Sequence, residues 1–193
     1  MLGQNGNQVS SGGPRMEKVV TFIDRVSEIV GKTFAWLVLG ITLAMSFEII
    51  SRRLAGRPTT WAFDFSYMSY GMYFMLGSAY TLSRNAHVRG DIFYRNFSPR
   101  TQATIDLVLY LVVFFPAMIA LTWVGWQFFF ASYRVHETSP LSPYATPVWP
   151  LKAAIPAGAA LLTLQGVAQV LRCITAIRTG QWPADMAEAE VLE

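Results

Sequence analysis

The sequence predicts an all-α integral membrane protein, in which four transmembrane helices follow an amphipathic interfacial helix. Hydrophobic residues make up 53% of the 193 residues, whereas charged residues make up only 14%. The charges are clustered, because four apolar stretches, residues 33–51, 65–83, 107–133 and 153–171, together contain a single charged residue, Glu48. About 20 apolar residues in a helix cross a hydrocarbon core of about 30 Å. The polar pieces between the stretches are shorter than the roughly 40 residues below which a domain needs disulfides, metals or partners to fold.

The four-helix transmembrane domain is predicted over residues 33–177, with its spans at about residues 33–51, 65–83, 104–133 and 153–175. The third span is long and contains Pro116, which lacks a backbone N–H, so we expect a kink there. Ser98 followed by Pro99 fits an N-cap with proline at the first helical position, so this helix should begin before its apolar run. The proline-rich connection over residues 134–152 favours extended chain over helix.

The polar ends of the chain are predicted to differ. Residues 1–14 are rich in Gly, Ser and Asn and are expected to be disordered. Over residues 15–32, apolar residues recur at three- and four-residue steps opposite a charged face, which is typical of an amphipathic helix. This arm is expected to lie in the cytoplasmic interface or against a partner helix, with a plain helical extension of the first span as the alternative. Residues 178–193 form an acidic tail that is expected to stay solvated.

The distribution of Lys and Arg orients the chain, because positively charged loops are retained in the cytoplasm. The arm, the loop after the second span and the tail, which includes Arg172 and Arg178, carry ten of these residues. The opposite side carries five. Both termini and the middle loop are therefore predicted to be cytoplasmic.

Glu48 is the only acid inside an apolar stretch, where an ionisable residue is a functional hypothesis by default. It lies near the outer end of the first span, one turn before Arg52, where a local ion pair would satisfy it. A structural or partner-facing role is therefore favoured over proton transport. His87 and His136 are predicted to lie at opposite membrane faces, so they cannot both ligate one haem.

Other chemistry has little support in the sequence. The single cysteine, Cys173, excludes an internal disulfide. No cluster of ligands predicts a metal or cofactor site, and no nucleophile is paired with a base, so we expect a non-enzyme.

Polar residues flank the second span. Asp64 and Trp61 open it, and a negative charge at a helix N-terminus is worth about 0.3 to 1 kcal/mol. A cluster of mixed charge follows the inner end, which suggests ion pairs or contacts with phospholipid head groups; its members are Arg84, His87, Arg89 and Asp91.

Small and aromatic residues predict close helix packing. Four pairs have small-xxx-small spacing, which permits close approach in lipid: Gly31 and Ala35, Gly40 and Ala44, Ala153 and Ala157, and Ala154 and Gly158. The second span also carries Tyr67, Tyr70, Tyr73, Phe74 and Tyr80. Tyrosine hydroxyls must find partners in lipid, which favours a helix packed against protein.

In this order, the features resemble the small membrane subunit (DctQ-type) of tripartite ATP-independent periplasmic (TRAP) transporters over about residues 16–183. The resemblance rests on the arm and spans, and on these residues: Trp61 with Asp64; Gly77, Ser78 and Ala79; His87, Val88, Arg89, Gly90 and Asp91; and Trp149, Pro150 and Pro156. Asp64 stands where the family often has glutamate, and Gly90 where a β-branched residue is common. Residues 61–100 and 177–183 resemble the branch associated with 2-oxo acids or similar organic anions.

The resemblance implies a three-part, sodium-coupled importer of organic acids in the bacterial inner membrane. A periplasmic substrate-binding protein captures the solute, and the large membrane subunit holds the substrate and sodium sites, so this chain needs no cofactor. As the small permease subunit it would form a heterodimer with the large subunit, scaffold it, contact phospholipids and bind no nucleic acid. Expected interface residues are Glu48, Arg52, Arg53, Trp61, Asp64 and Trp149 on the outer side, and Arg84, His87, Arg89 and Asp91 on the inner side.

Two other functions remain open at this point. One is a self-sufficient small homodimeric transporter with Glu48 as its proton carrier. The other is a haem-free, quinone-binding membrane anchor of a respiratory complex. A transporter of organic anions needs several polar groups at membrane depth, and this sequence has almost none, which favours a partner subunit.

Overall fold

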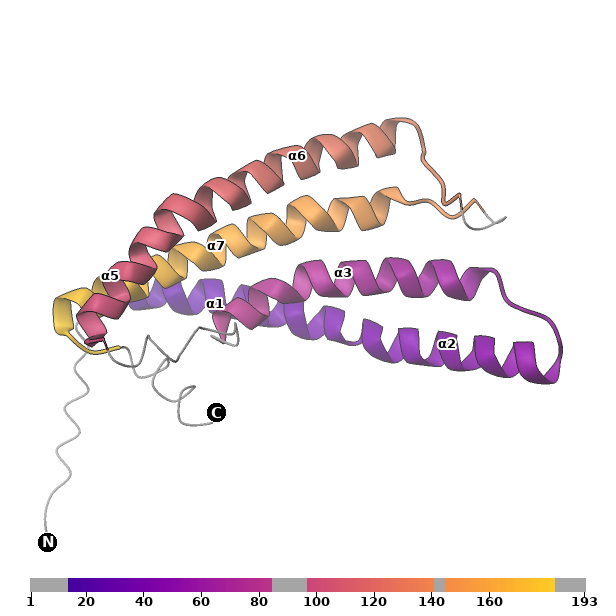
Figure 1. The fold of residues 1–193 in the computed structure, drawn as a ribbon, viewed down its shortest axis with the longest axis horizontal. Coiled ribbons are helices and arrows are strands. Elements are labelled where there is room, and N and C mark those ends of the chain that lie inside the picture. The colour runs from indigo at the N-terminus through magenta and orange to yellow at the C-terminus, as the bar shows by residue number, and fades with distance from the viewer. Residues whose placement is uncertain (1–13, 85–96, 141–144, 183–193) are drawn as a thin grey trace, which may run out of the picture.

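The structure, a computed structural model, describes residues 14–84, 97–140 and 145–182, and these residues are almost entirely helical. The elements are α1 (Pro14–Ala35), α2 (Leu37–Leu54), α3 (Trp61–Ser83), α5 (Pro99–Leu109), the π-helix η1 (Tyr110–Phe114), α6 (Phe115–Arg134) and α7 (Trp149–Thr179). Figure 1 shows long helices side by side, with the α2–α3 and α6–α7 connections at one end. The beginnings of α1 and α5 and the end of α7 lie at the other end. The predicted all-α class is confirmed.

Among the residues that the structure describes, three helical stretches are long and apolar enough to cross a membrane: Met16–Leu54, Pro99–Arg134 and Trp149–Thr179. The predicted second span forms helix α3, but α3 is not among these three. Its sequence explains this, because Asp64, several serines and four tyrosines interrupt its apolar residues. The four-span count therefore stays a prediction, and it depends on α3.

The arm forms helix α1, which is separated from α2 by Trp36 alone. Gly31 of α1 lies so close to Tyr80 of α3 that a Cβ at position 31 would overlap the tyrosine side chain. Ser27 is buried on the same side of α1, whereas Phe22 and Ile29 are exposed. The arm therefore packs on this chain's own helices and keeps an exposed apolar strip.

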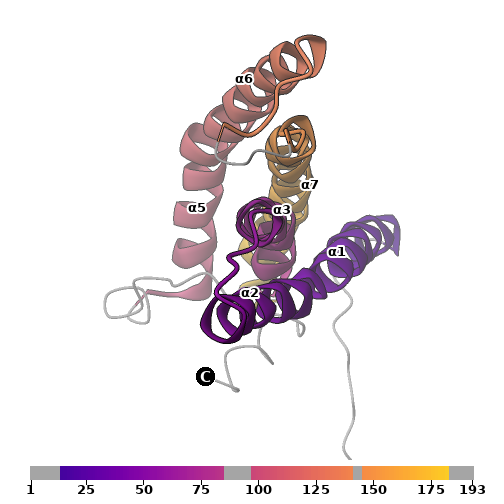
Figure 2. The ribbon, with the colours of Figure 1, turned by 90° about the vertical axis from the view of Figure 1, so that its right-hand side faces the viewer.

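The long third helical stretch begins and bends as the sequence predicts. Ser98 is the N-cap of α5 and accepts a hydrogen bond from the Thr101 backbone N–H, and Pro99 occupies the first turn. The π-helix η1 ends immediately before α6, whose first turn contains Pro116. Proline removes one backbone donor, and a π-helical turn is a common way to absorb such a break. In Figure 2, α5 and α6 run in different directions on either side of η1.

Glycine allows α7 to pack closely on its neighbours. A Cβ at Gly158 of α7 would lie 2.5 Å from the Met75 backbone oxygen of α3. A Cβ at Gly125 of α6 would lie 3.1 Å from Ile155 of α7. Ala154 and Gly158 are both buried, so this small-residue pair is confirmed as a packing face, whereas Ala157 is exposed and lies away from it.

Candidate functional site

Glu48 is buried near the end of α2, with 6% of its surface exposed. The Arg52 guanidinium donates to Glu48 Oε1 at 2.6 Å, so the ion pair predicted from their spacing is present. Glu48 Oε2 accepts from the Thr59 backbone N–H at 2.6 Å and from the Thr59 hydroxyl. Oε1 is therefore paired within α2, whereas Oε2 closes the α2–α3 connection.

Asp64 is buried in the first turn of α3, with 2% of its surface exposed. Its Oδ1 accepts a hydrogen bond from the Ser139 hydroxyl at 3.1 Å, which ties α3 to the α6–α7 connection. Its Oδ2 is buried and has no hydrogen-bond partner among the residues that the structure describes. Asp64 thus holds this chain together rather than lying on its surface.

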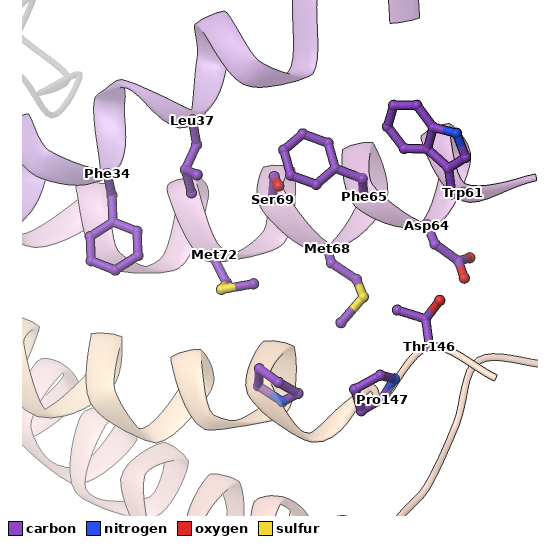
Figure 3. Close-up of a pocket in the computed structure, with 11 residues that line it drawn as sticks. Phe34, Leu37, Trp61, Asp64, Phe65, Met68, Ser69, Met72, Thr146 and Pro147 are labelled. Carbon is purple, nitrogen blue, oxygen red and sulfur yellow. The ribbon is translucent and has the colours of Figure 1, made fainter. Parts of the chain in front are cut away.

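A groove of about 530 Å³ runs from the α1–α2 junction along α3 to the start of α7. Its lining is mostly apolar and consists of Phe34, Leu37, Trp61, Asp64, Phe65, Met68, Ser69, Met72, Thr146, Pro147 and Pro150. Figure 3 shows Asp64 near Trp61 among the residues that line the groove, with its carboxylate pointing toward Thr146 and Pro147. A carboxylate repels anions, so this groove suits apolar groups and not an organic acid.

An ion pair and a backbone hydrogen bond hold the α6–α7 connection in place near the Asp64 end of the groove. Glu137 pairs with Lys152 of α7, and the Ser139 N–H donates to the Thr146 carbonyl at 2.8 Å. The Lys152 ammonium lowers the pKa of the Glu137 carboxyl by donating a hydrogen bond to it, and Ser132 adds to this effect. Thr138 and Pro147 therefore form an isolated antiparallel bridge, and the described chain on either side of it is not helical, as its prolines predict.

The other predicted outer residues lie at helix ends on the same side of the molecule as this connection. Arg52 and Arg53 are exposed at the end of α2, and Trp61 is 43% exposed at the start of α3. Trp149 is partly buried and packs edge-on against Tyr133, with ring centroids 5.6 Å apart. The two arginines and Trp61 are thus exposed to a partner, whereas Glu48 and Asp64 are buried and form hydrogen bonds within the chain.

A second polar cluster, which was not predicted from the sequence, joins α1 to α7. Asp24 accepts from Arg172 at 2.5 Å and from the Gln165 side chain at 2.7 Å. Ser27 donates to Gln165 at 2.9 Å. Arg172 and Gln165 are 5% and 0% exposed. Arg172, which the charge count grouped with the tail, therefore lies within α7, as the predicted fourth span implies, and is buried against the arm.

Two contacts reinforce the C-terminal end of α3. Gln169 of α7 donates to the Leu82 carbonyl at 3.1 Å, which satisfies one of the last carbonyls of α3. Arg84 lies 3.5 Å from Glu28 of the arm, and Glu28 also pairs with Lys32. His87, Arg89 and Asp91, the other members of the predicted inner cluster, lie outside the described residues.

No metal-binding constellation accompanies these clusters in the described part of the chain. Within it, no three or more His, Cys, Asp or Glu side chains come together to hold a metal ion. Every polar cluster instead links one helix to another element of the same chain. The described polar clusters therefore hold the helices of this chain together.

Comparison with known protein families agrees with the architecture. Residues 41–176 match the family described as tripartite ATP-independent periplasmic transporters, DctQ component. No curated protein matches the chain. The matched region runs from α2 into α7, so it includes the Glu48, Asp64 and Arg172 positions, and the arm precedes it. The chain therefore belongs to the DctQ family and is a small permease subunit of a TRAP transporter.

Proposed function

We propose that this chain scaffolds the large membrane subunit of a sodium-coupled importer of organic acids in the bacterial inner membrane. A periplasmic binding protein would deliver the solute, and the large subunit would hold both solute and sodium. One observation gives the strongest support for these separate roles of the two membrane subunits. The buried charged residues of the described chain form contacts inside it: Glu48 with Arg52 and Thr59, Arg172 with Asp24, and Asp64, through one of its two oxygens, with Ser139.

A transporter or coupling-ion site needs polar groups that face a cavity at membrane depth. Besides Ser69 and Thr146, the lining of the groove beside α3 has one charged residue, Asp64, and its negative charge disfavours an organic anion. This supports a scaffold role over the self-sufficient transporter, for which Glu48 would need to exchange protons.

We further propose that α3 crosses the membrane as the second of four spans, between α2 and α7. Its Asp64 and Ser69 are buried within the chain, so these polar groups are shielded from lipid. If the buried Arg172 is left out of the count, nine Lys and Arg residues lie on the inner side and five lie on the outer side. Both termini are then cytoplasmic.

In this orientation, Arg52, Arg53, Trp61 and Trp149 would contribute to an outer face for the large subunit or the binding protein. Arg84, His87, Arg89 and Asp91 would make inner ion pairs or bind phospholipid head groups. The exposed strip of α1 carries Phe22 and Ile29, so it would lie in the cytoplasmic interface.

Affinity purification of the tagged chain in mild detergent, from cells that express the whole transporter, tests this proposal. The large membrane subunit should co-purify in equal amount. Recovery of the chain as a homodimer, or with a soluble flavin or iron–sulfur subunit, would instead support the small transporter or the respiratory anchor.

A further inference from the structure

Helix α3 presents an exposed aromatic face. Phe63, Tyr67, Tyr70 and Phe74 follow one another at steps of four, three and four residues, so they share one side of the helix. Their exposed fractions are 55%, 50%, 61% and 58%, and the rings of Tyr70 and Phe74 stack with centroids 6.4 Å apart. We call these four residues the tyrosine face.

The flanks of α3 are already occupied, which isolates the tyrosine face. A Cβ at Gly40 of α2 would lie 3.4 Å from the Phe65 ring of α3, and Gly158 of α7 lies against Met75 of α3. The next turn is open, since a Cβ at Gly77 would meet only the Tyr73 ring, at 3.9 Å. The surface beside Phe74 therefore allows a helix to approach closely.

The hydroxyls on this face need partners. Neither Tyr67 nor Tyr70 forms a hydrogen bond to another residue in the described part of the chain. Tyr70 lies nine residues after Trp61 and thirteen before Ser83, or about 13 Å and 20 Å from the two helix ends at 1.5 Å per residue. Its hydroxyl is therefore too deep to reach the aqueous interface, where tyrosine normally places it. Acyl chains offer no acceptor at that depth.

The α5–η1–α6 stretch presents aliphatic side chains where α3 presents tyrosines. Between positions 108 and 119 its exposed large side chains are aliphatic, and they include five that are each at least 53% exposed: Val108, Leu111, Val112, Val113 and Ile119. We call these five residues the aliphatic surface. It fits lipid acyl chains without leaving any polar side chain unsatisfied.

We propose that the tyrosine face docks a transmembrane helix of the large subunit, which accepts hydrogen bonds from Tyr67 and Tyr70, while the aliphatic surface faces lipid. This inference rests on the proposed function. A subunit that holds an anion and a coupling ion has broken helices and polar side chains at membrane depth, and these supply acceptors. A second copy of this chain has few such groups to offer.

Site-specific photo-crosslinking in the intact transporter tests the assignment. A photoreactive phenylalanine analogue is placed at position 70 or, as a control, at position 112. Each position lies thirteen residues from the inner end of its helical stretch and is more than 60% exposed. Position 70 should yield an adduct with the large subunit, and position 112 should not.

Adducts from position 112 and none from position 70 would overturn the assignment, although co-purification of the two subunits would still support the proposed function. An adduct between two copies of this chain at position 70 would also overturn it. Failure of the unmodified subunits to co-purify would reject the proposed function itself, and this inference with it.

Removal of the hydroxyls alone provides a second readout. The double variant Y67F/Y70F keeps both rings, so the chain itself should fold normally. Each interhelical hydrogen bond in a membrane is worth about threefold in an equilibrium constant, so the amount of large subunit retained at limiting concentration should fall by up to about tenfold. Y133F, which removes an exposed hydroxyl at the end of α6, is the matched control and should retain it fully. Equal retention by Y67F/Y70F and Y133F would contradict the proposed hydrogen bonds.

Discussion

Arg172 Nη2 lies 2.5 Å from Asp24 Oδ2, and this ion pair joins α7 to the arm helix across 148 positions of sequence. The Arg172 side chain is 5% exposed and the Asp24 side chain 29% exposed, so water screens the pair only in part. Because Gln165 and Ser27 extend the same network, the arm is fixed to the bundle by polar contacts as well as by packing.

The variant Asp24→Ala should loosen the arm. It leaves Arg172 buried without its carboxylate, and removing one member of a buried pair costs about 3–5 kcal/mol. We expect a lower Tm of the purified complex and faster proteolysis within α1. The double variant D24A/R172M should recover most of the loss, because methionine fills the space without a charge.

Lys32→Ala provides the matched control on the same helix. Lys32 pairs with Glu28 at the surface, where its side chain is 63% exposed. Exposed pairs contribute little, so Tm should barely change. A loss as large as that of D24A would show that any charge change in the arm is harmful, and would remove the special role of the Asp24–Arg172 pair.

Gly158→Val should disrupt the α3–α7 contact. The added Cβ would lie 2.5 Å from the Met75 carbonyl oxygen, which belongs to the backbone and cannot rotate away. Overpacking of this kind typically costs about 1–3 kcal/mol. Size-exclusion chromatography should show less monodisperse protein, whereas Ala157→Val, one position earlier on the exposed side of α7, should match the wild type.

The Glu137–Lys152 pair should make the outer connection sensitive to acid. Lys152 lowers the pKa of Glu137 in the folded protein. The pair therefore stabilises the connection fully above the ordinary glutamate pKa of about 4.3, and this contribution is lost as the pH falls through the lowered pKa. Hydrogen exchange at Ser139 and Val148 should stay slow at neutral pH and accelerate, beyond its intrinsic change, only below that range. Glu137→Gln should remove this acid-dependent step and exchange faster at neutral pH; an unchanged acid profile in this variant would contradict the assignment.

Glu48→Gln should leave transport by the assembled complex largely intact. The amide keeps an oxygen for Thr59 or Arg52 and removes only the charge. A small fall in Tm is expected because the Arg52 pair is weakened. Solute uptake that is abolished in this variant, with the complex still assembled, would instead support a proton-carrying role.

Local features were predictable from the sequence. The Ser98 N-cap and the Glu48–Arg52 pair depend on residues within one helical turn, and the break near Pro116 follows from a missing backbone donor. Such features require only the geometry of a helix, which is the same in every protein.

Contacts between distant segments were not predictable. Asp24 and Arg172 each looked like an ordinary surface charge, and only the crossing of α1 over α7 brings them together. Asp64 was expected to act at a helix N-terminus, and its hydrogen bond to Ser139 depends on how the α6–α7 connection folds back. The tyrosines of α3 were expected to need partners in protein, but their exposure becomes clear only once the positions of α2 and α7 are known.

Solute uptake into proteoliposomes under an imposed sodium gradient tests the central claim most directly. Vesicles contain this chain alone, the large subunit alone or both, with the binding protein and a labelled organic acid outside. We predict no uptake by this chain alone and sodium-dependent uptake when both subunits are present. Uptake by this chain alone, abolished by Glu48→Gln, would contradict the account.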